Sequence, residues 1–187
     1  MRDMHPTDRN IHRPLHLYLD NQVYFITARC FDNAFHFRNK RDIVKGIIED
    51  LIKKFEYQLS AWVILFDHLH LLMKVKKEFK EFIKQLNGKI GFEINQADGI
   101  EGRRVMHQYW DICVRDEKDF YTFFNYIHHN PVNERICSNQ EEVLNYQFCS
   151  YKYWFDKMGE EWIASCFKEY PVVDYTWECE KDFRITD

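Results

Sequence analysis

The sequence predicts an α+β domain of the ferredoxin-like, split β-α-β type: an antiparallel sheet with helices on one face, followed by an aromatic C-terminal tail. Segments typical of strands and helices alternate in the order β-α-β-β-α-β between residues 21 and 114, which is the order of that fold. The chain has 187 residues, is 45% hydrophobic and 17% aromatic, and holds only 6 glycines and 4 prolines. This composition supports one buried core and excludes a collagenous, linker-rich or globally disordered protein.

Four segments have the composition of β-strands. Residues 21–30 are rich in aromatic and β-branched side chains, and residues 106–114 form a similar segment. Residues 57–65 and 68–75 are separated only by a short break at Asp67, so we expect them to pair as antiparallel neighbours.

Apolar periodicity predicts the helices. Residues 42–55 and 78–95 repeat apolar side chains three and four positions apart, as amphipathic helices do. A third helix is expected to begin after Asp116, a good N-cap, and to end near His129, because Pro131 cannot continue the backbone hydrogen bonding. A short final helix over residues 139–144 precedes the tail, whose aromatic side chains are Trp162, Tyr170, Tyr175 and Trp177.

The charge is unevenly distributed along the chain. The formal net charge of −4 argues at first against a nucleic-acid partner, since a phosphate backbone attracts cations. Residues 140–187 hold 11 acidic and 5 basic side chains, whereas residues 1–139 hold 19 acidic and 21 basic ones and all 9 histidines. The acidity therefore belongs to the C-terminal part, and the body of the protein remains compatible with DNA.

No segment of the sequence is long and apolar enough for a membrane span or a signal peptide. The 6 cysteines are scattered without a C-x-x-C pair, so neither a disulfide framework nor a zinc knuckle is predicted. We therefore expect a cytoplasmic protein without a membrane partner.

His68 and His70 form the first pattern that carries chemistry. They stand two positions apart in a predicted strand, so both imidazoles project from one face, among leucines. Histidines in an apolar run are costly unless they are hydrogen-bonded or bind a cation. The pair is therefore either two ordinary hydrogen-bonded histidines or two ligands of a divalent metal.

Tyr126 and Asn130 form the second pattern, near the end of the third predicted helix. Being four positions apart, they share one helical face, and His129 is expected near that face as well. Tyr126 is either a core aromatic beside the helix end or a nucleophile. A phenol, with an ordinary pKa of about 10, needs a base or a nearby cation to act as a nucleophile.

Together, the two patterns resemble the HUH single-tyrosine transposases, and among them the REP-associated tyrosine transposases. The H-x-H strand is followed by a Tyr-Ile-x-x-Asn-Pro-Val segment that begins at Tyr126 and is the hallmark of that group. Residues 24–29, 108–111 and 149–153 match as well, so the resemblance covers about residues 10–155. It implies a transposase-like domain over residues 1–155. The C-terminal extension over residues 156–187 lies outside the match, and we expect it to pack on the domain; the alternative is that it covers the active site or binds DNA.

The resemblance implies an enzyme that cleaves and rejoins single-stranded DNA containing a hairpin. His68, His70 and Asn130 would bind Mg²⁺ or Mn²⁺, and Tyr126 would attack the phosphate to form a 5′-phosphotyrosine. Such an enzyme would be associated with the nucleoid. The resemblance leaves the oligomeric state open between a monomer and a homodimer.

The sequence departs from the family at Asp67, where the family commonly has asparagine. A carboxylate there could hydrogen-bond to a metal-binding side chain without binding the metal itself, or it could alter the metal preference. The neighbouring imidazoles of His128 and His129 leave the ligand assignment around Asn130 open.

DNA contacts are expected from basic side chains of the body and of an N-terminal arm. Residues 72–104 hold 8 basic against 5 acidic side chains. The alternative is that these groups are only solvated helix faces and a frayed terminus. The candidates are Lys74, Lys76, Lys77, Arg103 and Arg104 in the body, with Arg9 and Arg13 in the arm.

Three functions remain open from the sequence. The first is a metal-dependent single-strand DNA nickase and ligase with Tyr126 as its nucleophile. The second is a domesticated DNA-hairpin-binding module without catalysis. The third is a metal hydrolase that activates a water with His68, His70 and His129.

Overall fold

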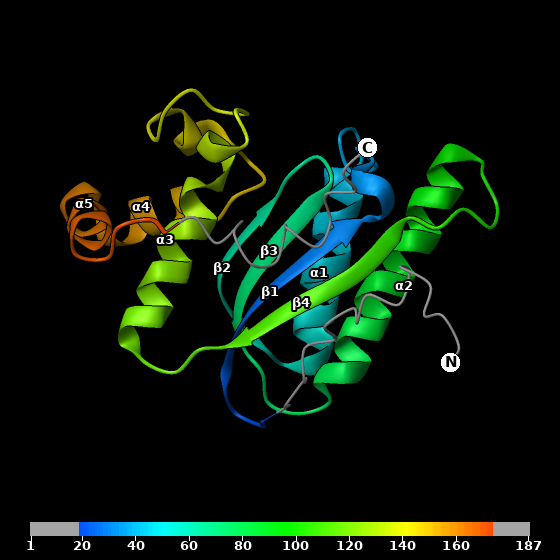
Figure 1. The fold of residues 1–187 in the computed structure, drawn as a ribbon, viewed down its shortest axis with the longest axis horizontal. Helices are drawn as coiled ribbons and strands as arrows, with labels where there is room; N and C mark the ends of the chain where they lie inside the picture. Colours follow the sequence, from blue (N-terminus) through cyan, green and yellow to red (C-terminus); the bar gives the residue numbers. More distant parts are fainter. Residues whose placement is uncertain (1–18, 174–187) are drawn as a thin grey trace, which may run out of the picture.

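The computed structural model describes residues 19–173 of the chain (Figure 1). Its centre is a four-stranded antiparallel sheet in the order β2-β3-β1-β4. The strands are β1 (Val23–Cys30), β2 (Gln58–Ile64), β3 (His68–Lys74) and β4 (Met106–Cys113). The predicted order of strands and helices is confirmed, and so is the antiparallel pairing of the second and third strands.

Helices α1 (Arg41–Phe55) and α2 (Phe79–Asp98) cover one face of the sheet (Figure 1), as the ferredoxin-like plan requires. Their apolar stripes and the strand side chains on that face form the larger core, in which Ile26, Leu71 and Phe82 are fully buried. Burial of a side chain of this size stabilises the fold by about 1.5–3 kcal/mol. This face therefore stabilises the sheet that carries the candidate site on its other side.

Helix α3 (Glu117–Asn133) lies on the opposite face, against β2 and β3 (Figure 1). The Asp116 carboxylate caps it as predicted, accepting a first-turn backbone N–H at 2.8 Å. The predicted end near His129 is wrong, because the helix includes Pro131 in its last turn. Only the N–H that proline lacks is lost there, and the Glu134 N–H still donates to the Asn130 carbonyl at 2.9 Å.

The C-terminal part of the described chain is helical. The predicted final helix over residues 139–144 is instead a short 3-10 helix, η2 (Glu142–Asn145), and helices α4 (Tyr151–Met158) and α5 (Glu160–Glu169) follow it. A second 3-10 helix, η1 (Phe31–Asn33), follows β1. Helix α5 is attached to α3, where the Asn125 amide donates to the carbonyl oxygens of Cys166 and Tyr170 at 2.8 and 2.7 Å.

Four of the predicted features lie outside the described residues: Arg9, Arg13, Tyr175 and Trp177. Within residues 19–173, none of the helices combines the length and the apolar character that a membrane span requires. The cysteines of that range carry free thiols.

Candidate active site

Strand β3 presents His68 and His70 to the face that α3 covers. In the sheet register His68 lies opposite Arg29 of β1, and His70 lies opposite Thr27. Because side chains alternate along a strand, both imidazoles lie on one face. They are 1% and 2% exposed, and their ring centroids are 4.9 Å apart.

Each imidazole is held through its Nδ1 atom. The His68 Nδ1–H donates to the Asp67 carboxylate at 2.6 Å, and the His70 Nδ1 is hydrogen-bonded to the Thr27 hydroxyl at 2.8 Å. A carboxylate oxygen only accepts, so the proton of neutral His68 is on Nδ1 and its Nε2 carries a lone pair. Among the described residues, the Nε2 atoms of both histidines are buried and have no hydrogen-bond partner.

Helix α3 brings Tyr126 against the same histidines. The Tyr126 ring lies 5.3 Å from the His70 ring and 5.8 Å from Phe25, measured between centroids, and is 3% exposed. One turn earlier, Phe123 stacks on Phe25 at 4.5 Å. The helix therefore runs from the level of Phe25 toward the level of His68.

Asn130 is one helical turn beyond Tyr126 in that direction. Four helical residues advance about 6 Å, which nearly equals the spacing of about 6.6 Å between alternate strand residues such as His70 and His68. The Asn130 side chain is buried, at 2% exposure. Its Oδ1 atom has no hydrogen-bond partner within the described part of the chain.

The three predicted ligands fit a divalent cation. A buried acceptor without a partner costs about 1–3 kcal/mol, and this cost is removed when the acceptor binds a cation. Imidazole nitrogen and amide oxygen are suitable donors for Mn²⁺ and related ions. Residues 19–173 contain no group of three histidine, cysteine, aspartate or glutamate side chains arranged to hold a metal, so a metal here depends on the Asn130 oxygen as its third protein ligand.

The electrostatics of the site favour a neutral His70 beside an ionised Asp67. Burial, together with the charges of His68 and Arg29, lowers the pKa of His70 well below its ordinary value. Burial raises the pKa of Asp67, but its hydrogen bond with His68 and the charges of His68 and Arg29 outweigh this, so the pKa is lowered overall. At neutral pH, Asp67 is therefore a carboxylate and His70 is neutral, which is the form that ligation requires.

The expectation that His129 lies near the face of Tyr126 is wrong. Its Nδ1 is hydrogen-bonded to the Gln140 side chain at 2.8 Å, and its ring lines a cavity formed with α4 and α5. The adjacent His128 is fully buried and hydrogen-bonded to the Ser150 hydroxyl at 2.7 Å. At 100° per residue, His129 lies about 60° from Tyr126 on the side away from Asn130.

A family model described as transposase IS200-like matches residues 23–130, which is more than half of the chain. The chain belongs to the IS200-like transposase family. The match runs from the start of β1 to Asn130, so it includes the H-x-H strand and the tyrosine helix. No curated protein sequence matches the chain significantly.

Two solved structures are similar to this transposase-family chain. A REP-associated tyrosine transposase bound to a REP hairpin superposes with a TM-score of 0.64 and 16% identity, over 75% of this chain and 83% of its own. A structure assigned as a transposase of Deinococcus radiodurans gives a TM-score of 0.44 and 17% identity, over 66% and 93% of the two chains. The first match and the family model confirm the fold and the resemblance to REP-associated transposases.

In this IS200-like transposase the predicted DNA-contacting lysines are far from the histidines. Lys74, Lys76 and Lys77 are exposed at the end of β3 opposite to His68. Six strand residues at about 3.3 Å each separate that end from His68 by roughly 20 Å. Lys76 is paired with Glu56 at 2.8 Å.

The predicted arginines lie at the histidine end of the sheet. Arg103 and Arg104 precede β4, whose first residues pair with the end of β1 near Arg29. The Arg104 guanidinium lies 4.5 Å from the centroid of the Phe31 ring. Arg103 is paired with Asp98 at 2.5 Å, so Arg104 is the less constrained of the two arginines.

Sequence reasoning missed Thr27 and Arg29 of β1, which lie beside the histidines of this transposase. Strand alternation puts both on one face with Phe25, and this much is visible in the sequence. Their pairing with His70 and His68 is set by the register between β1 and β3. That register depends on how the whole sheet packs, so no local pattern around residues 23–30 could have given it.

Proposed function

We propose that this protein is a metal-dependent transposase that cleaves and rejoins single-stranded DNA at hairpin-containing sites through a 5′-phosphotyrosine on Tyr126. One observation carries the proposal. Three buried polar atoms near Tyr126 have no hydrogen-bond partner among the described residues: His68 Nε2, His70 Nε2 and Asn130 Oδ1. Membership of the IS200-like transposase family supports it.

His68, His70 and Asn130 would hold Mg²⁺ or Mn²⁺, which when bound supplies positive charge to the scissile phosphate. The packing of Tyr126 against Phe25 and His70 fixes the ring before DNA arrives. Such preorganisation removes much of the entropic cost of aligning the phenol oxygen with the phosphorus.

The chemical step exchanges one phosphate ester for another. The Tyr126 oxygen loses its proton and attacks the phosphorus, the P–O3′ bond breaks, and the departing 3′ oxygen takes up a proton to become a hydroxyl. In the reverse step a 3′-hydroxyl attacks the phosphotyrosine and releases Tyr126. The number of phosphate ester bonds is unchanged, so rejoining needs no energy from a nucleoside triphosphate.

The two other functions have weaker support. A binding module without catalysis gains nothing from three buried, unpartnered polar atoms that cost about 1–3 kcal/mol each. A hydrolase that relies on His129 is disfavoured, because the His129 side chain is hydrogen-bonded to Gln140 and lines the cavity formed with α4 and α5.

The substrate class follows from fold and family together. The fold-similar REP-associated transposase is bound to a REP hairpin, so we infer a hairpin with a single-stranded flank for this protein too. An enzyme acting on such DNA would be associated with the nucleoid, as a monomer or a homodimer.

The test is covalent capture of DNA. Full-length protein is incubated with hairpin-containing single-stranded DNA and Mn²⁺, and denaturing electrophoresis detects the adduct. Tyr126→Phe is expected to abolish the adduct while DNA binding remains. Tyr121→Phe is the matched control on the same helix, where the ring stacks on Tyr170 at 5.0 Å, and it should form the adduct normally.

Each contrary outcome points to a different function for this protein. An unchanged adduct in Tyr126→Phe refutes the nucleophile. Cleavage that survives this substitution without an adduct indicates a hydrolase, and hairpin binding without cleavage in either metal indicates a binding module.

A further inference from the structure

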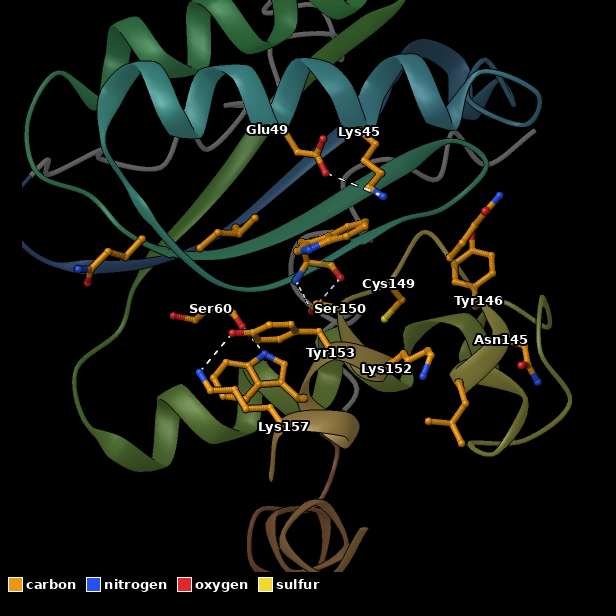
Figure 2. Close-up of a pocket in the computed structure, with 16 residues that line it drawn as sticks. Lys45, Glu49, Ser60, Asn145, Tyr146, Cys149, Ser150, Lys152, Tyr153 and Lys157 are labelled. Carbon is orange, nitrogen blue, oxygen red and sulfur yellow. Dashed lines mark hydrogen bonds and ion pairs between the residues drawn. The ribbon is translucent and has the colours of Figure 1, made fainter. Parts of the chain in front are cut away.

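A groove of about 990 Å³ runs along the outer edge of the sheet between α1, β2 and α4 (Figure 2). We call it the edge groove and define it by Lys45, Trp62, Lys152, Tyr153, Trp154 and Lys157. It is separate from the histidine site. Val63 of β2 pairs with His70, and side chains alternate along a strand, so the neighbouring Trp62 lies on the opposite face of the sheet from His70.

The edge of β2 determines the shape of the groove. β2 is an outer strand of the sheet, and its second half is covered where the Ser150 N–H donates to the Trp62 carbonyl at 3.0 Å. Toward its start, the Ser60 carbonyl accepts the Trp154 indole N–H at 2.7 Å. Helix α4 is thereby fixed beside the strand, so the groove has a rigid wall.

The aromatic side chains of the groove offer flat surfaces. Tyr153 is 58% exposed, whereas Tyr151 of the same helix is buried. The Lys157 Nζ lies 5.3 Å from the Tyr153 ring centroid and 5.1 Å from that of Trp154. Rings of this kind, bordered by lysines, are the surfaces on which unpaired bases stack.

The groove is positively charged, although the chain as a whole is negative. Its lining holds three lysines and one acidic residue, Glu49, and Figure 2 shows Lys45 on the α1 wall opposite Tyr153 and Lys157 of α4. Lys45 is 3.9 Å from Glu49, and Lys152 pairs with Asp156 outside the lining at 2.8 Å. Exposed pairs of this kind contribute little stability, so phosphates can displace them.

We propose that the edge groove binds unpaired nucleotides of single-stranded DNA, with a base stacked on Tyr153 and phosphates held by Lys45, Lys152 and Lys157. The inference rests on the proposed function, which supplies the single-stranded substrate. A peptide strand added to the edge of β2 would use backbone hydrogen bonds and would have no need of three lysines. The positive charge of the groove therefore favours a nucleic acid over a peptide strand as its ligand.

The groove is structurally connected to the catalytic helix. The Ser150 hydroxyl in its floor accepts the Trp62 N–H at 2.9 Å and is bonded to His128 of α3 at 2.7 Å. His128 is fully buried two residues before Asn130. Single-stranded DNA bound in the groove would therefore lie along β2, which is the neighbour of the strand that carries His70.

The test measures affinity for fluorescein-labelled (dT)12 by anisotropy, with full-length protein. Tyr153→Ala is expected to weaken binding about tenfold, the usual effect of removing one stacking platform. The triple variant Lys45→Ala, Lys152→Ala, Lys157→Ala is expected to reduce the slope of log affinity against log salt by about 2, at roughly 0.7 per single-strand phosphate contact.

The controls lie on α2, away from the groove. Phe92→Ala removes a ring that is 59% exposed, nearly the same as Tyr153, and Lys84→Ala removes a lysine whose side chain is 81% exposed. Both should bind (dT)12 as the wild type does. Circular dichroism and the melting temperature of each variant check that the overall fold is retained.

The outcomes separate this inference from the proposed function. Unchanged (dT)12 affinity in the groove variants, with a normal Tyr126 adduct, overturns the groove and leaves the enzyme. Lost affinity in those variants without any adduct in the wild type supports the groove and refutes the enzyme. Equal weakening for a 12-base-pair duplex overturns the stacking of unpaired bases.

Discussion

Asp67 offers the sharpest test of the proposed metal site, because it would act through its hydrogen bond to His68 without binding the metal itself. Its carboxylate accepts the His68 Nδ1–H at 2.6 Å, which orients the ring and leaves Nε2 for a cation. The lowered pKa of Asp67 keeps this group ionised at neutral pH. Outer partners of metal-bound histidines raise the basicity of the ligand, and their loss typically weakens metal affinity about 10–100-fold.

The two substitutions at Asp67 are expected to differ in size. Asp67→Asn retains an amide oxygen that accepts the same hydrogen bond but lacks the charge, so we expect about a tenfold loss of Mn²⁺ affinity, or about 1.4 kcal/mol. Asp67→Ala leaves the buried Nδ1–H without a partner and frees the ring to rotate. We expect about a hundredfold loss, or about 2.7 kcal/mol.

The measurement is Mn²⁺ titration of DNA-free protein, followed by the electron paramagnetic resonance signal of the free ion. Nitrogen-15 NMR of His68 reports in parallel which ring nitrogen carries the proton. Asp50→Asn, at an exposed position of α1, is the control and should bind Mn²⁺ normally. Wild-type affinity and an unchanged His68 tautomer in Asp67→Ala would refute the reasoning.

Two further predictions concern stability. Mn²⁺ at about 100 times its dissociation constant should add about 2.7 kcal/mol to the free energy of unfolding and raise the melting temperature by about 5–10 °C; an equal shift in His70→Ala would show that the ion binds elsewhere. Burial lowers the pKa of His128 to about 3, so the unfolded chain, with an ordinary histidine pKa of about 6.5, binds more protons between these values. Above about pH 6.5 the free energy of unfolding is therefore independent of His128 protonation. As the pH falls below that value, the free energy of unfolding decreases by about 1.4 kcal/mol per pH unit. Urea denaturation at pH 7 and pH 5 should show a smaller loss in His128→Gln, and an equal loss in both proteins would contradict this assignment.

The sequence was sufficient where one local period determines the answer. Strand alternation placed His68 and His70 on one face, and the helical spacing of four placed Asn130 with Tyr126. The order of the elements predicted the sheet and its two covering helices. The two side-chain placements depend on neighbours within about five residues, which is the range that sequence patterns describe.

Local patterns failed where tertiary packing decides the result. The spacing of three from Tyr126 left His129 near the boundary of the helical face, and the contact with Gln140, 11 positions away, determined its direction. Pro131 was expected to end its helix, but it lies in the last turn. There the missing proline N–H removes one backbone hydrogen bond, which destabilises the helix little. Helices α4 and α5 were missed because they are short and take their stability from packing on α3.

The unpartnered acceptors link function to the stability of this fold. A domain of ordinary stability retains about 5–15 kcal/mol, and three buried acceptors at about 1–3 kcal/mol each would consume a large share of it. Apolar side chains at His68, His70 and Asn130 would be buried without that cost. A sequence that needed only the fold would gain by replacing them. The proposed cation would complete their coordination beside Tyr126, and the same cation would be expected to stabilise the connection between β3 and α3.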